Sequence, residues 1–136
     1  MSNIEQTLSI IKPDAVERNL TENIKNEFKS NGFTIKNEKK IKLEKSEAEK
    51  FYQVHQSKPF FNDLCEYLSS GPILVMVLEK LNAVMDNRKL MGATDPQKAE
   101  EGTLRKKYGI SIDKNSVHGS DSMDNAKIEI DFFFSN

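Results

Sequence analysis

The chain has 136 residues, of which 37% are hydrophobic and 30% are charged. This length fits one compact domain over residues 1–136, and the recurring apolar segments exclude a largely disordered chain. The formal net charge of −1 excludes strong bulk attraction to nucleic acid or acidic lipid. We therefore expect no dedicated nucleic-acid surface, and any polyanion must be bound by a local cluster of cations.

The cysteine usage and the first residues indicate the compartment. Cys65 is the only cysteine, so no disulfide can form within the chain, which favours a reducing compartment. The first residues lack the basic region and the continuous apolar region of a signal peptide, and no apolar run is long enough to span a bilayer. These features predict a cytoplasmic protein that does not enter membranes.

In chain order, the first predicted element is a β-strand over residues 7–11, which should end at Pro13 because proline cannot donate to a sheet ladder. A helix should follow, because three apolar residues recur at every fourth position: Leu20, Ile24 and Phe28. Residues 33–43 place apolar side chains at both ends of a lysine-rich middle, which predicts a long strand with one solvent-exposed face.

Two helices are predicted next, separated by a break at Lys58 and Pro59. Ser46 and Glu49 have the spacing of a capping box at the start of the first helix. The second helix has apolar residues at helical spacing: Phe61, Leu64, Cys65 and Leu68. Residues 73–78 are continuously apolar, which predicts a central strand buried on both faces.

The C-terminal part should contain a helix over residues 82–91, a polar loop over 92–102 and a terminal helix from about Ser122. The apolar face of that terminal helix consists of Ala126, Ile130 and Phe133. A short fourth strand fits residues 116–118. Strands and helices interleave without a repeat or a linker, which predicts a small α/β or α+β sandwich with helices packed on a sheet.

The basic residues are the first candidates for a binding site. Both glycine-rich phosphate loops, GxxxxGK[ST] and GxGxxG, are absent, so side chains would have to hold any phosphate. Only three of the 20 basic residues are arginines, and Arg88 and Arg105 flank the polar loop. Guanidinium groups suit oxyanions, although ordinary surface ion pairs would explain the same arginines. Lys12 follows the first strand, either as a ligand-binding residue or as a solvated turn residue.

His118 stands in the segment NSVHGSDS and is one of only two histidines. A metal site is disfavoured, because no ligand spacing links it to His55 or Cys65. A Ser-His-Asp hydrolase is also disfavoured, since Ser120 and Asp121 lie in the same loop and no nucleophile elbow is present. A nucleophilic histidine remains, which requires a group that orients one ring nitrogen and cations that hold the leaving group.

The final helix could supply the orienting group. Glu129 lies about two turns into this helix and could reach back toward the His118 loop. Ser120 or Asp121 would cap the helix, and its positive end would then favour a phosphoryl group nearby. His55 closes a helix face before a break, and we interpret it as structural.

Several aromatic residues leave two interpretations open. Tyr52 and Phe60 are either core residues or rings that contact a base. Phe61 keeps the helical phase and is the better core candidate, whereas Phe60 is out of phase and should be exposed. The three phenylalanines at 132–134 indicate packing or a subunit contact.

Taken together, the segments TLSIIKPDAV, KPFF, SGP, LMGATDP, GTLR and NSVHGSDS resemble the nucleoside diphosphate kinases, over residues 7–134. The resemblance implies a ferredoxin-like βαββαβ core with added helices and a four-stranded antiparallel sheet. It implies transfer of the terminal phosphoryl group from a nucleoside triphosphate such as ATP to a nucleoside diphosphate, through a phosphohistidine. It also implies Mg²⁺ carried by the nucleotide phosphates, without a protein metal site, and a homo-oligomer that is a tetramer or a hexamer.

The resemblance also implies roles for single residues. His118 would be the nucleophile, Glu129 would hold its other ring nitrogen, and Ser120 would assist. Phe60 would stack on the base, and Ile112 would line the same cleft. The positions that match those holding phosphates and sugar are Lys12, Tyr52, Arg88, Thr94, Arg105 and Asn115, and Lys12 is also expected to act in catalysis.

Some positions depart from the usual family pattern: Ala15, Glu101, Lys106, Lys107 and Ser116. The two lysines change the local charge, which predicts an altered nucleotide affinity or salt dependence. Two other functions stay open at this point. One is a non-catalytic nucleotide-binding or interaction module, and the other is a phosphohistidine donor to other proteins.

Overall fold

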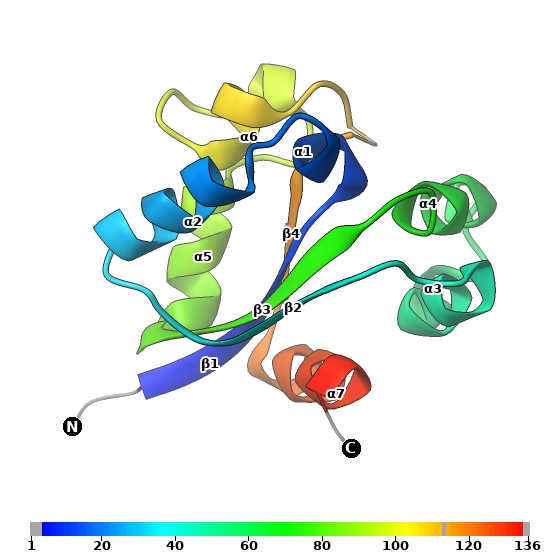
Figure 1. Cartoon of the computed structure of the whole chain (residues 1–136), viewed down its shortest axis with the longest axis horizontal. Helices are drawn as coiled ribbons and strands as arrows, with labels where there is room; N and C mark the ends of the chain where they lie inside the picture. The colour runs from blue at the N-terminus through cyan, green and yellow to red at the C-terminus, as the bar shows by residue number, and fades with distance from the viewer. Residues whose placement is uncertain (1–3, 113, 135–136) are drawn as a thin grey trace.

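A four-stranded antiparallel sheet forms the centre of the computed structural model, which describes residues 4–112 and 114–134 (Figure 1). The strands are β1 (Ile4–Ile11), β2 (Thr34–Ile41), β3 (Ile73–Leu81) and β4 (Val117–Gly119), in the order β2-β3-β1-β4. β1 pairs with β3 and β4, and β2 pairs with β3, all antiparallel. The sheet predicted for a ferredoxin-like core is thereby confirmed.

Helices connect the strands and cover both faces of the sheet (Figure 1). They are α1 (Pro13–Glu17), α2 (Thr21–Ser30), α3 (Lys45–Phe51), α4 (Phe61–Leu68), α5 (Ala83–Met91), α6 (Leu104–Tyr108) and α7 (Met123–Phe134), with 3-10 turns η1 (Gln53–His55) and η2 (Pro96–Lys98). α3 and α4 lie between β2 and β3, and α7 follows β4, so these are among the helices added to the βαββαβ order.

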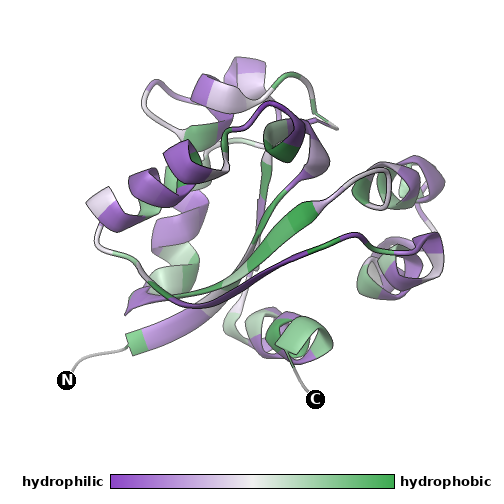
Figure 2. Ribbon diagram, viewed as in Figure 1, coloured by the Kyte–Doolittle hydropathy of each residue, from purple (hydrophilic) through white to green (hydrophobic). Residues whose placement is uncertain are grey.

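The sheet separates two hydrophobic cores (Figure 2). One core lies against α1, α2, α5 and α6 and contains the fully buried Phe28 and Leu104. The other lies against α3, α4 and α7 and contains Cys65 and Phe133. Side chains alternate between the two cores along β1 and β3, because successive residues of a strand point to opposite faces.

Most of the predicted elements are confirmed. The apolar run of residues 73–78 lies in β3, between β2 and β1, and the periodic helices predicted from apolar spacing are α2, α4 and α7. The middle of β2, residues 36–40, is exposed on both faces, whereas the sequence predicted only one exposed face. The sequence patterns did not predict α1 and α6, because five residues are too few to show a helical period.

The predicted start of α3 was wrong by two residues. Glu44 is the N-cap residue, and its backbone N–H donates to Glu47 Oε1 at 2.9 Å. Ser46 and Glu49 therefore lie inside the helix. The two pairs have the same spacing, and a carboxylate can take the place of the serine hydroxyl at a helix N-terminus.

β4 is the short strand expected near residues 116–118, and it begins one residue later. It pairs with the end of β1, where His118 lies opposite Ile10 and Gly119 lies opposite Ser9. Ser116 leads into this strand with a φ of 74°, in the left-handed region. This pairing places His118 beside the point where β1 passes into Lys12.

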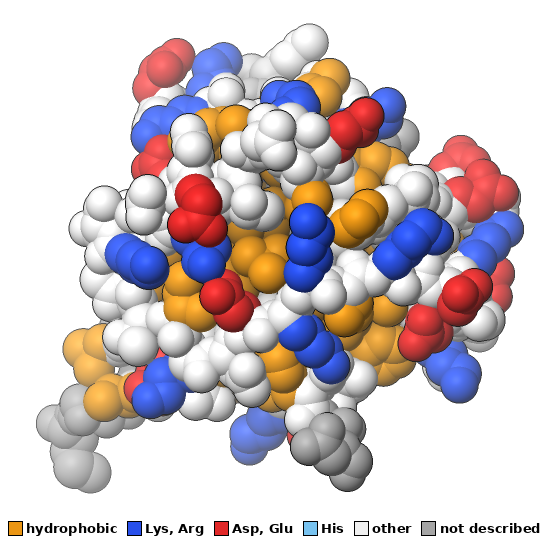
Figure 3. All heavy atoms as spheres, in the orientation of Figure 1, with side chains coloured by type: hydrophobic (Ala, Val, Ile, Leu, Met, Phe, Trp, Pro, Cys, Tyr) orange, Lys and Arg blue, Asp and Glu red, His pale blue; other side chains and the backbone are white. Residues whose placement is uncertain are grey.

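Two surface properties bear on partners. Within residues 4–112 and 114–134, no helix has the length and apolar character needed to cross a membrane. On the face drawn in Figure 3, basic and acidic side chains alternate with hydrophobic ones, and no large patch of one charge covers it.

Candidate active site

His118 is held by two side chains from the C-terminal part of the chain. Its Nε2 lies 3.1 Å from Glu129 Oε1 on α7, and the Ser120 hydroxyl donates to the same oxygen at 2.8 Å. The side chains of His118 and Glu129 are only 21% and 18% exposed, so water screens this contact little. The predicted reach of Glu129 back to the His118 loop is confirmed.

This contact fixes the tautomer of the neutral imidazole. An ionised carboxylate can only accept hydrogen bonds, so Nε2 of His118 carries the hydrogen and Nδ1 keeps a lone pair. In the part of the chain that the structure describes, Nδ1 has no hydrogen-bond partner. The ring is therefore oriented on one side and available for chemistry on the other, as a nucleophilic histidine requires.

Ser120 connects the site to β1 and does not cap α7. Its Oγ accepts from the Leu8 N–H at 3.3 Å, and its own N–H donates to the Leu8 carbonyl at 3.1 Å. At the start of α7 the Ser122 hydroxyl accepts from the Asn125 N–H at 3.1 Å. The predicted cap at Ser120 or Asp121 was wrong, because the helix starts after Ser122. The Ser120 hydroxyl instead contacts Leu8 of β1 and Glu129.

Aromatic side chains form one wall around the imidazole. Phe51 packs edge-on to the His118 ring at a centroid distance of 5.3 Å, and Tyr52 lies at 6.4 Å. A cavity of about 150 Å³ lies here, lined by these three residues, His55 and Asp121 among others. Sequence reasoning had missed Phe51. Its place directly before Tyr52 was the only available signal.

His55 also belongs to this cavity wall, and its interpretation as a structural residue stays a prediction. Its ring lies 6.2 Å from Tyr52 and 6.3 Å from Phe60, and its Nδ1 is buried without a hydrogen-bond partner among the described residues. Burial lowers the pKa of His55, and the nearby Lys58 lowers it further, so the ring is neutral at neutral pH. Burial also raises the pKa of Tyr52, which keeps its hydroxyl protonated.

A second group of predicted residues is joined through Asn115. Lys12, only 5% exposed, donates from Nζ to Asn115 Oδ1 at 2.9 Å. The Asn115 amide nitrogen donates to the Thr94 carbonyl at 3.1 Å. Because Asn115 is three residues before His118, this chain of contacts places an ammonium group and the Thr94 loop next to the β4 strand.

Arg105 fastens the polar loop to β4. Its Nη1 donates to the Gly92 carbonyl and its Nη2 to the Val117 carbonyl, both at 3.0 Å. Burial lowers the pKa of Arg105 to about 10, so the group stays cationic at neutral pH. Its Nε is buried and has no partner among the described residues. A cationic side chain therefore binds the carbonyl of Val117, the residue before His118, and its Nε donor is still unpaired among the described residues.

The remaining predicted residues lie at the margins. Arg88 lines an open groove of about 450 Å³ together with Lys98 and residues of the loop after α5. Phe60 is 47% exposed, as its phase predicted, with Lys58 Nζ 5.7 Å from its ring centroid. Ile112 is 55% exposed and lies in a different groove, so the structure does not bring it against Phe60.

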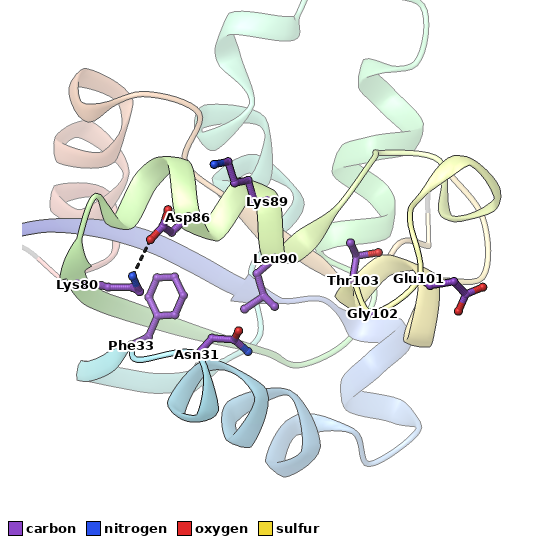
Figure 4. A pocket seen from close by; sticks show the side chains of 9 residues that line it. All are labelled: Asn31, Phe33, Lys80, Asp86, Lys89, Leu90, Glu101, Gly102 and Thr103. Carbon is purple, nitrogen blue, oxygen red and sulfur yellow. Dashed lines mark hydrogen bonds and ion pairs between the residues drawn. The ribbon is translucent and has the colours of Figure 1, made fainter.

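Another open groove lies away from the imidazole, between α2, α5 and the start of α6 (Figure 4). Its volume is about 440 Å³, and Figure 4 shows Asn31, Phe33 and Leu90 around it. The charges there cancel, because Lys80 Nζ lies 2.6 Å from Asp86 Oδ2. The cavity beside His118 is therefore the better candidate for chemistry.

The comparisons with known proteins agree with this geometry. The family model described as nucleoside diphosphate kinase matches residues 5–136. The chain belongs to the nucleoside diphosphate kinase family. The family identification made from the sequence motifs is thereby confirmed, together with the enzyme class, since proteins of this family are phosphotransferases.

Individual relatives cover almost the whole chain. It is 57% identical to the nucleoside diphosphate kinase of Wolinella succinogenes over 132 residues, which is 97% of this chain and 96% of that protein. It is 58% identical to the corresponding protein of Campylobacter hominis, over 96% of each chain. The crystal structure of the Aquifex aeolicus nucleoside diphosphate kinase superposes with a TM-score of 0.96 at 39% identity, over 98% of this chain and 97% of that one. The ferredoxin-like fold of the family is therefore the fold of this chain.

Proposed function

We propose that this protein transfers the terminal phosphoryl group of a nucleoside triphosphate such as ATP to a nucleoside diphosphate, by a ping-pong reaction through a phosphohistidine at His118. The observation that carries the proposal is the imidazole itself. Its Nε2 is held by Glu129 at 3.1 Å, its Nδ1 has no partner among the described residues, and the partly buried Arg105 is bonded to the carbonyl of the preceding Val117. Membership of the nucleoside diphosphate kinase family supports the same reaction.

In the first half-reaction, the Nδ1 lone pair of His118 attacks the terminal phosphorus. The N–P bond forms while the P–O bond to the leaving nucleoside diphosphate breaks, and the diphosphate takes that electron pair. The imidazole gains positive charge in this step, and the Glu129 carboxylate stabilises that charge through Nε2. Ser120 keeps the carboxylate in place. In the second half-reaction, a different diphosphate attacks the phosphohistidine, and the same bonds change in reverse.

The cationic side chains next to the His118 strand would hold the phosphates. Arg105 and Lys12 lie next to the His118 strand in a region of little water, where a phosphate gains more from a positive charge than it would in solution. Arg88, Thr94 and Asn115 would hold the remaining phosphate and sugar oxygens. The protonated Tyr52 hydroxyl would add one further donor.

Mg²⁺ would arrive with the nucleotide. Of the residues that the structure describes, no three His, Cys, Asp or Glu side chains gather in a way that could hold a metal ion. The side chains near His118 are mainly cationic or neutral, and the Glu129 carboxylate already accepts two hydrogen bonds. This donor set suits an ion held by nucleotide phosphates and water, which reduces the charge on the phosphates.

Phe60 would stack on one face of the base, and the exposed loop that carries Ile112 would contact the other face. Phe60 is 47% exposed, so its ring face is available to a ligand, and stacking tolerates every base. Ile112 would reach the same base only if its exposed loop moves toward Phe60 when a nucleotide binds. This arrangement favours a broad range of nucleosides.

The assembled protein would be a homo-oligomer in the cytoplasm, either a tetramer or a hexamer. Large hydrophobic side chains remain exposed, among them Ile4 and Leu81. These two residues lie opposite each other where β1 begins and β3 ends. Exposed apolar side chains of this kind are typical of contact surfaces between subunits. The buried free thiol of Cys65 suits a reducing compartment. Sedimentation equilibrium would distinguish the two oligomers.

The direct test follows the label on the terminal phosphate of ATP. Wild type, His118→Gln and His55→Gln would each be incubated with Mg²⁺ and labelled ATP, and acid-labile, base-stable label on the protein would be counted. Unlabelled GDP would then be added. Label on wild type and on His55→Gln, lost from both into GTP, supports the proposal. Because the chain has only two histidines, label that persists on His118→Gln would refute the assigned nucleophile.

A further inference from the structure

Ser116, the residue before β4, connects the His118 strand to the end of β1, to α1 and to the end of α6. It is fully buried and has a φ of 74°, which a residue other than glycine seldom adopts. Its carbonyl accepts from the Lys12 N–H at 2.8 Å, so its backbone already joins the end of β1 to the start of β4.

The hydroxyl of Ser116 makes contacts that an apolar side chain could not make. Its Oγ lies 2.8 Å from Asp14 Oδ2 and 3.0 Å from the Tyr108 carbonyl, either of which can accept its single hydrogen. Arg18 Nη2 donates to the same hydroxyl at 3.2 Å. The hydroxyl therefore both donates and accepts, and its contacts tie the residue before β4 to α1 and to the end of α6.

Asp14 is the centre of this polar cluster. It is only 5% exposed, and its carboxylate accepts from Arg18 Nη2 at 3.0 Å and from the Tyr67 hydroxyl in addition to Ser116. Burial and the adjacent carboxylate raise the pKa of Tyr67, so this hydroxyl remains a donor. A buried carboxylate needs such donors, and the loss of one leaves it under-solvated.

The cluster bears directly on the proposed chemistry, because Asp14 is two residues from Lys12 and Ser116 is two residues from His118. Lys12 Nζ donates to Asn115, the residue before Ser116. We propose that the Ser116 hydroxyl is a positioning group for phosphoryl transfer, which fixes the separation of Lys12 and His118 through its hydrogen bond to Asp14. This inference rests on the proposed function, since it gives a role to the same site.

The test compares Ser116→Ala with Ser69→Ala. Ser69 Oγ also donates a 2.8 Å hydrogen bond, to the Cys65 carbonyl, and among the described residues its hydroxyl contacts only carbonyls of α4. We expect the single-turnover rate of phosphohistidine formation, at saturating ATP, to fall about five- to tenfold in Ser116→Ala and to stay unchanged in Ser69→Ala. The KM for ATP should change less than twofold, because the base and the outer phosphates are held elsewhere. Ser116→Gly, which removes the hydroxyl and relaxes the backbone, should be as slow as Ser116→Ala.

Asp14→Asn provides a second, independent measurement. If the hydroxyl acts through Asp14, the double variant with Ser116→Ala should be no slower than the slower single variant. Rates that multiply in the double variant would overturn the inference, as would a normal rate in Ser116→Ala whose only change is a lower melting temperature. Failure of the proposed function gives a different result, because wild type itself would then acquire no label on His118.

Discussion

The carboxylate of Glu129 offers the sharpest test of how the imidazole is activated. One oxygen, Oε1, accepts both from His118 Nε2 and from the Ser120 hydroxyl. In Glu129→Gln the amide oxygen can take the place of Oε1, so the orientation of the ring is kept while the charge is lost. In Glu129→Ala both the acceptor and the charge are lost. The pair of variants therefore separates charge stabilisation from positioning.

The magnitudes follow from the strength of these hydrogen bonds. A bond to a charged group contributes about 1.5–3 kcal/mol and a neutral one about 0.5–1.5 kcal/mol, so the charge alone is worth about 1–1.5 kcal/mol. With about 1.36 kcal/mol for each tenfold change in rate, Glu129→Gln should slow phosphohistidine formation roughly 5- to 13-fold. Glu129→Ala should slow it roughly 13- to 160-fold. No discount for screening is needed, because the Glu129 side chain is 18% exposed.

The assay is a rapid-quench measurement of label transfer from ATP to protein at saturating nucleotide, stopped with base. Glu66→Gln serves as the control, because this exposed glutamate contacts Lys45 and Asn62 at the surface and should react at the wild-type rate. Two results would refute the reasoning. One is a wild-type rate in Glu129→Gln with an unchanged melting temperature, and the other is an equal rate in both Glu129 variants.

Three further predictions concern single residues around the site. Gly119→Ala should lower the free energy of unfolding by about 1–3 kcal/mol, and with it the melting temperature, because the new Cβ would lie 2.8 Å from Met91 Cε and against the Asn87 side chain. An unchanged melting curve would contradict this. Phe60→Ala should raise the KM for ATP and GTP alike by roughly fivefold, from the loss of about 1 kcal/mol of stacking, and a base-dependent effect would show that the ring reads the base. For His55, the folded pKa is below the value of 6.5 expected of an unfolded chain, so the unfolded chain binds more protons as pH falls through that range. Thermal melting at pH 7.5 and 5.5 should therefore show a larger loss of stability in wild type than in His55→Gln, and equal losses would exclude this titration.

Elements with a strong local pattern could be predicted from the sequence. The spacing of Leu20, Ile24 and Phe28 predicted α2, and the apolar run of β3 predicted its central place in the sheet. The five-residue helices have no such pattern. α6 begins at the Thr103 cap, whose hydroxyl accepts from the Lys106 N–H. A threonine alone does not mark a helix start in a sequence, so this cap could not be recognised. Short elements depend on tertiary contacts, which a local pattern does not contain.

The family motifs name candidate residues for the site, and their assigned roles stay predictions, but the contacts between these residues could not be predicted from the sequence. Lys12 and Asn115 are 103 residues apart in sequence, and only the fold brings Nζ to Oδ1. His55 has no neighbouring motif that marks it, and its place in the cavity depends on a 3-10 turn after α3. The altered charge at Lys107 shows the same limit. Its ammonium lies 2.8 Å from Glu27 Oε2 on α2, a contact that the sequence did not indicate. The effect of Lys106 and Lys107 on nucleotide affinity and salt dependence stays a prediction.

The shortness of β4 explains why so many side chains converge on it. A strand of three residues forms only a few ladder hydrogen bonds, yet the position of His118 depends on it. Arg105 holds the Val117 carbonyl from the side of the polar loop, and Ser116 holds the preceding residue from the side of α1. Ser120, two residues after His118, accepts from the Leu8 N–H of β1. Ser116, Val117 and Ser120 are thus each held by a side-chain hydrogen bond, and we expect the position of the imidazole to depend on these bonds more than on the sheet ladder.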